Sequence, residues 1–194
     1  MPRPTQAFID LSSLAHHLGV VRQYVPCSRI MAVVKADAYG HGLLHTASAL
    51  KDVDGFALLE LDAAISLRDA GYQQPILLLE GFFSTEELAL FEQYRLSAVI
   101  HHSEQIAMLS DSKHHNLDLF LKINTGMNRL GLAPEQFPQI MKALTDHPGI
   151  DSITLMTHFA SADDPLEEDE VFQQLQYFEA ITQNHKYPHS LANS

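Results

Sequence analysis

Short apolar runs alternate with longer amphipathic stretches along the chain. The apolar runs have the length and β-branched composition of buried strands, and they predict strands over residues 8–10, 30–35, 55–59, 75–79, 97–100, 117–123, 150–156 and 189–193. The amphipathic stretches predict helices over residues 11–24, 42–50, 61–70, 103–110, 134–144 and 168–184. Asp10 is expected to cap the first helix. Ser84 and Glu87 have the spacing of a capping box that opens one more helix.

This alternation has no hairpin signal, which indicates βαβ units and a parallel sheet. A doubly wound sheet and a (β/α)8 barrel both fit the order. A dinucleotide-binding doubly wound sheet needs a glycine fingerprint after its first strand, and residues 36–42 do not contain one. The barrel is therefore favoured. A barrel needs eight strands over about 250 residues, and about seven of the predicted strands follow one another in series from residue 30 onward. We therefore expect residues 1–194 to be a truncated barrel domain.

Composition and charge restrict the classes of partner. The chain has 194 residues, 46% hydrophobic and 19% charged, as in globular proteins with a sizeable core. A formal net charge of −12 argues against binding to nucleic acid or to an anionic membrane surface. The first residues contain no apolar signal-peptide segment, and no apolar run reaches the ~18 residues of a membrane-spanning helix. With a single cysteine as well, the chain is expected to be cytoplasmic.

The first candidate for chemistry is Lys35, which follows the apolar run of residues 30–34. In a barrel, residues at the carboxyl ends of strands line the active site. A partly desolvated lysine amine can condense with an aldehyde. Gly40 and Gly42 would let the backbone approach a ligand closely, and Tyr39 adds a hydroxyl at the same end of the strand. The alternative is a lysine that extends to solvent from a strand end.

Three further strand ends carry candidate residues. Lys122 lies near the end of the strand of residues 117–123, and Arg129 lies in the loop that follows. Two cations there would suit the anionic groups of a ligand. An ordinary surface loop explains this segment equally well. His158 follows the strand of residues 150–156, and a structural histidine is the alternative there. Asn193 and Ser194 lie where barrels commonly bind phosphate, after the seventh strand.

The twelve histidines suggest a check for a metal site. His41 and His45 are four residues apart and could share one face of a helix, as zinc ligands do. No glutamate lies between them, and no third ligand is near in the sequence. We therefore expect no metal.

Taken in order, these segments resemble the alanine racemase family, which comprises fold-type III pyridoxal-phosphate enzymes. Residues 32–42, AVVKADAYGHG, are similar to the family's cofactor-lysine segment. Residues 122–131, KINTGMNRLG, and residues 157–163, THFASAD, match in the same order, and residues 78–83, LLEGFF, are similar to the bacterial enzymes. The resemblance extends from Phe8 to Ser194 and implies the N-terminal barrel portion of such an enzyme.

The resemblance implies a role for each candidate residue. Lys35 would hold pyridoxal 5′-phosphate covalently and serve as one of two proton-transferring bases. Tyr39 would bind the cofactor phosphate. Arg129 would lie beside the pyridoxal 3′-oxygen and position the substrate, and Lys122 would be the lysine that the family often carries as a carbamate, whose charge orients that arginine. His158 would border the pyridine ring.

Other parts of the family's site are expected at the end of the chain or outside it. Ser194, with Asn193 beside it, would contact the cofactor phosphate. The second base of the family is a tyrosine of a C-terminal β domain, contributed by the partner subunit of a homodimer, and that domain is absent here. Asn124 stands where the family most often has aspartate, which puts the loop around Lys122 in doubt.

Three functions remain open at this point. The first is interconversion of L- and D-alanine, which supplies D-alanine for peptidoglycan, by a parent protein of which this chain would be an inactive portion. The second is another enzyme of the same fold type, either a racemase of broad specificity or an amino-acid decarboxylase. The third is a non-catalytic fragment that binds the cofactor or nothing.

Overall fold

Parallel strands form the frame of the structure. A computed structural model describes residues 7–110 and 116–191 of the chain. Its strands are β1 (Met31–Val33), β2 (Gly55–Leu58), β3 (Ile76–Leu78), β4 (Ser97–Ile100), β5 (Leu117–Lys122), β6 (Ile150–Met156) and β7 (His189–Ser190). β1 pairs with β2, and β3 to β7 pair in succession, all in parallel. The predicted strand over residues 8–10 is wrong, because these residues are irregular.

The chain divides into two units, and the first comprises Met1–Ile76. Its helices are α1 (Leu11–Tyr24), α2 (Lys35–Tyr39), α3 (Leu43–Ala49) and α4 (Leu61–Asp69). The predicted cap of α1 is confirmed, since Asp10 Oδ1 accepts hydrogen bonds from the backbone N–H groups of Ser12 and Ser13 at 2.9 and 3.4 Å.

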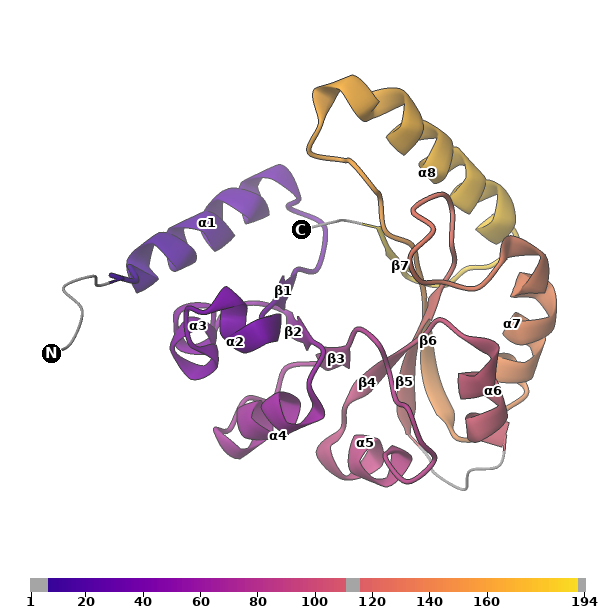
Figure 1. Ribbon diagram of the computed structural model, residues 1–194, viewed down its shortest axis with the longest axis horizontal. Coiled ribbons are helices and arrows are strands. Elements are labelled where there is room, and N and C mark those ends of the chain that lie inside the picture. The colour runs from indigo at the N-terminus through magenta and orange to yellow at the C-terminus, as the bar shows by residue number, and fades with distance from the viewer. Residues whose placement is uncertain (1–6, 111–115, 192–194) are drawn as a thin grey trace, which may run out of the picture. The chain divides into compact units, whose positions relative to one another are not determined.

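The second unit, Leu77–Ser194, carries the remaining helices. They are α5 (Leu88–Tyr94), α6 (Ser103–Ser110), α7 (Phe137–Thr145) and α8 (Glu168–Thr182), with short 3₁₀ turns η1 (Pro134–Gln136) and η2 (Pro165–Glu167). In Figure 1 helices α5 to α8 lie on the outer side of strands β4 to β7. The expected helix start at Ser84 is wrong. Glu87 accepts from the backbone N–H of Phe83 at 2.8 Å, and α5 begins after it.

Burial is uneven among the strands. Every residue of β2 and β4 is buried, and Phe82 packs edge-to-face on Phe91 with ring centroids 5.8 Å apart. β1, in contrast, is half-exposed at all its positions, so the expectation of a strand buried on both faces is wrong there. β1 is the first strand in the sheet order, which leaves it one neighbouring strand, β2, among the described residues.

The sheet order establishes the fold class. The strands follow one another in sequence order from β1 to β7, with helices in the connections, which confirms an incomplete (β/α)8 barrel.

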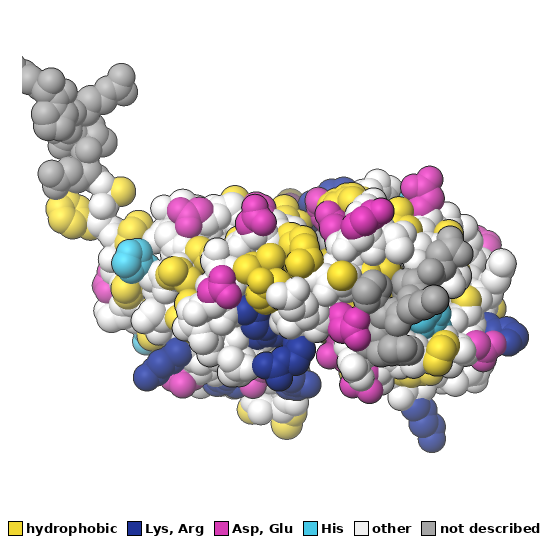
Figure 2. Space-filling model, turned by 90° about the horizontal axis from the view of Figure 1, so that it is seen from below, with side chains coloured by type: hydrophobic (Ala, Val, Ile, Leu, Met, Phe, Trp, Pro, Cys, Tyr) yellow, Lys and Arg dark blue, Asp and Glu magenta, His cyan; other side chains and the backbone are white. Residues whose placement is uncertain are grey.

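Figure 2 shows acidic side chains spread among apolar and uncharged ones on one face, with Lys and Arg side chains between them. Within residues 7–110 and 116–191, no helix combines the length and apolar character needed to cross a bilayer.

Candidate functional site

Lys35 lies at the carboxyl end of β1, as predicted. The strand ends at Val33, Val34 is 2% exposed, and Lys35 begins α2 with a half-buried side chain. The backbone N–H of Val34 still donates to the carbonyl oxygen of Ala57 on β2, at 2.8 Å. The residue before the lysine is therefore held by the sheet, which fixes the position from which the amine projects.

The segment after Lys35 is a left-handed turn. Positive φ angles of 51° to 56° occur at consecutive residues, namely Ala36, Asp37, Ala38 and Tyr39. For residues with a Cβ this conformation costs roughly 1–2 kcal/mol each. Hydrogen bonds to Asp37 offset part of the cost, because its carbonyl oxygen accepts from Gly42 N–H at 2.9 Å and its Oδ1 accepts from Leu43 N–H at 2.7 Å. Such strain persists where the surrounding structure holds it, and it concentrates at functional sites.

The left-handed turn brings Tyr39 back toward Lys35. Lys35 Nζ lies 5.9 Å from the centroid of the Tyr39 ring, and Tyr39 is 54% exposed. An amine and a phenol hydroxyl are thus presented together at the end of one strand. From Gly40 and Gly42 the sequence predicted only that the backbone can approach a ligand closely. The positive φ angles of the four residues before Gly40 could not be predicted, since alanine and tyrosine rarely adopt them.

In the second unit, the loop after β5 is closed at its base. The N–H of Leu132 donates to the carbonyl oxygen of Lys122 at 2.9 Å, and the N–H of Asn124 donates to the carbonyl oxygen of Leu132 at 3.0 Å. Gly131 is required for this closure, because a Cβ there would lie 2.7 Å from the Asn124 nitrogen. Arg129 lies in this closed loop and is exposed.

Asn124 organises the interior of the same loop. Its Oδ1 accepts from the N–H groups of Gly126 and Asn128 at 3.2 and 3.0 Å, and its Nδ2 donates to Asn128 Oδ1 at 2.9 Å. An aspartate could accept the first two bonds but could not donate the third. Asn124 is therefore suited to this loop by its amide, and its partner Asn128 directly precedes Arg129.

Lys122 is 8% exposed, and the charge of its amine acts on the neighbouring His101. Burial lowers the pKa of His101 below the ordinary 6.5, the hydrogen bond to the Glu80 carbonyl opposes this, and the charge of Lys122 lowers it further. His101 Nε2 lies 3.0 Å from that carbonyl oxygen. Sequence reasoning did not select His101, although its place directly after β4 at a strand carboxyl end was an available signal.

His158 follows β6 and is half-buried. The residue before it, Thr157, is 2% exposed; its hydroxyl donates to the carbonyl oxygen of Ile123 at 3.0 Å and accepts from the hydroxyl of Thr125 at 2.7 Å. This buried pair joins the ends of β5 and β6. The structure therefore ties together the starts of the two loops that carry Arg129 and His158.

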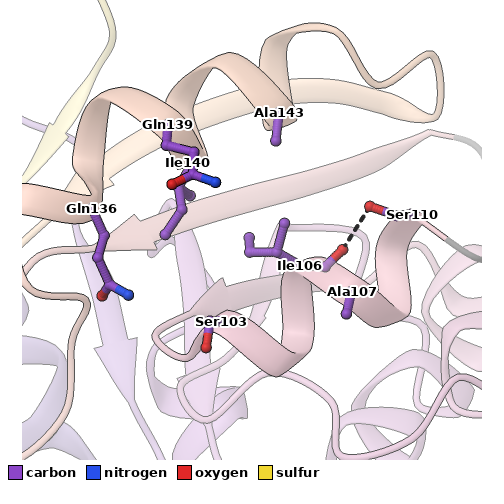
Figure 3. A pocket seen from close by; sticks show the side chains of 8 residues that line it. All are labelled: Ser103, Ile106, Ala107, Ser110, Gln136, Gln139, Ile140 and Ala143. Atoms are coloured by element: carbon purple, nitrogen blue, oxygen red, sulfur yellow. Dashed lines mark hydrogen bonds between the residues drawn. The ribbon is translucent and has the colours of Figure 1, made fainter.

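Neither the end of the chain nor the groove between α6 and α7 adds a described candidate residue to those above. Asn193 and Ser194 lie outside the described residues. A groove between α6 and α7, lined by side chains such as Ile106, Gln139 and Ile140, contains none of the candidate residues (Figure 3). Among the described residues, no three His, Cys, Asp or Glu side chains are grouped so that they could hold a metal ion.

Comparison with known proteins gives the family. The family model described as "Alanine racemase, N-terminal domain" matches residues 9–194. The chain belongs to the alanine racemase family. Alanine racemases of Nitrosospira multiformis and Nitrosomonas europaea are 56% identical over 195 residues and 57% identical over 197 residues. Both alignments cover 100% of this chain but 55% and 54% of the relatives, so the chain spans about half the length of the curated racemases it matches.

Solved structures agree with the family. The biosynthetic alanine racemase from Pseudomonas aeruginosa is 38% identical with a TM-score of 0.87, over 96% of this chain and 52% of that one. A histidine racemase from Leuconostoc mesenteroides is 29% identical with a TM-score of 0.81, over 94% of this chain and 51% of that one.

The family implies pyridoxal phosphate as cofactor, and the first unit fits it. The cofactor needs an amine for its aldehyde and hydrogen-bond donors for its phosphate. Lys35 is half-buried at a strand end, and the exposed Tyr39 ring lies beside it, so both groups are available from one short segment.

Proposed function

We propose that the protein interconverts L- and D-alanine, with pyridoxal phosphate held at Lys35. The observation that carries the proposal is Lys35 at the end of β1, followed by a left-handed turn that returns Tyr39 to within 5.9 Å of its amine, within an unbroken match to the racemase family. Supply of D-alanine for the cell wall, a homodimeric assembly and a cytoplasmic location are parts of the same proposal.

Lys35 and Tyr39 have separate tasks in this reaction. When bound, pyridoxal phosphate supplies the electron sink that makes the proton on Cα of the amino acid acidic. The Lys35 amine removes that proton from one face or returns it. The Tyr39 hydroxyl would donate a hydrogen bond to the cofactor phosphate, and the strained turn keeps the Tyr39 ring near the lysine.

In the second unit, roles in the same reaction are proposed for Arg129, His158 and Lys122. The exposed Arg129 guanidinium binds anionic oxygen atoms of cofactor and substrate. The half-buried His158 would help to hold the cofactor ring. Lys122, if carried as a carbamate, would present a negative charge that orients Arg129. Asn193 and Ser194 are proposed as phosphate contacts.

Replacement of Lys35 tests the proposal. In the full-length protein, Lys35→Ala should abolish the visible absorbance of bound cofactor. It should also lower the rate of D-alanine formation from L-alanine by roughly a hundredfold or more. Lys51→Ala, at an exposed lysine of the same unit, is the matched control and should change neither. Wild-type protein that forms no D-alanine, or a Lys35→Ala variant that remains active, would refute the assignment.

The histidine racemase neighbour supports a second candidate, racemisation of a larger amino acid on the same scaffold. The same assay with L-histidine in place of L-alanine separates the two. A value of kcat/KM that is higher for histidine than for alanine would replace the first proposal by the second.

A further inference from the structure

Two buried glutamines repeat the same arrangement in the second unit. Gln105 on α6 is 4% exposed and Gln174 on α8 is 7% exposed. α6 follows β4, and α8 follows β6. Each side chain contacts the backbone of two successive loops. For Gln105 these are the loops after β3 and β4, and for Gln174 they are the loops after β5 and β6. We refer to Gln105 and Gln174 as the bridging glutamines.

Gln105 shows the arrangement most completely. Its Oε1 accepts from the N–H groups of His101 and His102, after β4, at 2.9 and 3.2 Å. Its Nε2 donates to the carbonyl oxygens of Glu80 and Phe82, after β3, at 3.0 and 3.3 Å. The glycine between those two has no room for a side chain, since a Cβ at Gly81 would lie 2.6 Å from this Nε2.

Gln174 contacts the loop after β6 by a hydrogen bond and the loop after β5 by close packing. Its Oε1 accepts from the N–H of Ala160 at 3.3 Å. Its amide and Cγ lie directly against Gly126, where a Cβ would be 2.8 Å from Nε2 and 3.0 Å from Cγ. Because φ of Gly126 is 147°, a residue with a side chain would also be strained there. A glycine and a glutamine thus meet at this loop as they do at the loop after β3.

The two loops that Gln174 contacts are those that carry candidate site residues. Gly126 is three residues before Arg129, and Ala160 is two residues after His158. The Thr125–Thr157 hydroxyl pair fixes the start of both loops. Gln174 contacts both loops beyond that pair, from helix α8, at Gly126 and at Ala160.

We propose that Gln174 is a positioning residue, which holds the Arg129 loop and the His158 loop at a fixed separation for the racemase reaction. This inference rests on the proposed function. Gln174 does not touch the reacting atoms. Its effect is exerted through the backbone of Gly126 and Ala160, and a misplacement of about 1 Å at reacting groups can cost up to a hundredfold in rate.

Three variants of the protein as its gene encodes it test this role. Gln174→Met keeps the length of the side chain and removes both polar atoms. Gln174→Glu keeps an acceptor for Ala160 N–H. Gln176→Ala, at an exposed glutamine of the same helix, is the matched control. The readouts are kcat and KM for L-alanine, the dissociation constant of pyridoxal phosphate and the melting temperature, with kinetics recorded well below the melting temperature of each variant.

The expected pattern distinguishes positioning from simple stabilisation. Gln174→Met should lower kcat about tenfold with KM changed less than about threefold, and weaken cofactor affinity several-fold. Gln174→Glu should lose less, and Gln176→Ala should match the wild type. A lower melting temperature with unchanged kcat and cofactor affinity in both Gln174 variants would overturn the proposal, as would equal losses in Gln176→Ala.

The cofactor titration separates this inference from the proposed function. If wild-type protein binds pyridoxal phosphate but racemises neither alanine nor histidine, the racemase assignment fails. Unchanged cofactor affinity in Gln174→Met would then overturn the positioning role as well. If the wild type is an active racemase and both Gln174 variants have the same kcat, KM and cofactor affinity as the wild type, the positioning role fails and the racemase assignment stands.

Discussion

At the scale of single residues, the burial of His101 makes the stability of the fold depend on pH. It is half-buried after β4, with Lys122, Glu80 and His102 as the charged or titratable groups that influence it. Burial is the largest influence on its pKa and lowers it below the ordinary 6.5. The folded protein therefore favours the neutral imidazole.

This gives a pH prediction with a definite sign. Unfolded chains take up the His101 proton near the ordinary pKa of 6.5, whereas the folded protein takes it up at lower pH, so acidification favours unfolding. The urea midpoint of the wild type should fall as the pH drops below about 6.5, and His101→Gln should reduce that fall. His102→Gln, at the exposed neighbour, is the control. Identical pH profiles of His101→Gln and wild type would contradict the assignment.

Residue-scale features of the site were only partly predictable. Lys35 and His158 could be selected because each follows an apolar run, and barrel chemistry lies at strand ends. The Thr125–Thr157 pair and the contact of Gln174 with Gly126 join residues that are 32 and 48 positions apart in the sequence. Contacts of that separation depend on tertiary packing, which no local pattern of the chain contains.

At the scale of elements, prediction succeeded where periodicity and caps agree. The predicted bounds of α1, α6, β4 and β6 are those of the structure. It failed where hydrogen bonds between a side chain and the backbone a few residues away favour a conformation that the sequence pattern does not indicate. The Ser84–Glu87 spacing resembles a cap, but Glu87 bonds to Phe83 instead. α2 adopts left-handed angles that its residues disfavour, because Asp37 and the glycines after it close the turn.

Helix α1 leads to a prediction about local stability. It has no buried residue, whereas α7 buries residues of its apolar face, namely Phe137, Ile140, Met141 and Leu144. Elements with little buried apolar area open with a small free energy. In hydrogen-exchange mass spectrometry of residues 1–194, the amides of α1 should exchange at least about tenfold faster than those of α7. Equal protection of the two helices would show that α1 is held by contacts other than apolar burial.

At the scale of the whole molecule, racemisation needs two bases, and the residues proposed for this chain supply one. Racemisation needs a proton removed from one face of Cα and returned to the other. Among the residues proposed for the site, Lys35 supplies a base for one face. The resemblance to the family implies that the second base is a tyrosine outside residues 1–194, and the relatives are about twice as long as this chain.

Residues 1–194 expressed alone should therefore separate cofactor binding from turnover. We expect the polypeptide to bind pyridoxal phosphate through Lys35, with a visible absorbance that Lys35→Ala removes, because the amine and Tyr39 belong to one short turn. We expect no D-alanine formation above the rate of free cofactor, measured in a coupled assay, because a single base exchanges the Cα proton on one face. In deuterated water, with L- and D-alanine assayed separately, the same polypeptide should still exchange the Cα hydrogen of one enantiomer slowly, with retention of configuration. D-alanine formation that Lys35→Ala abolishes would show that residues 1–194 contain both bases.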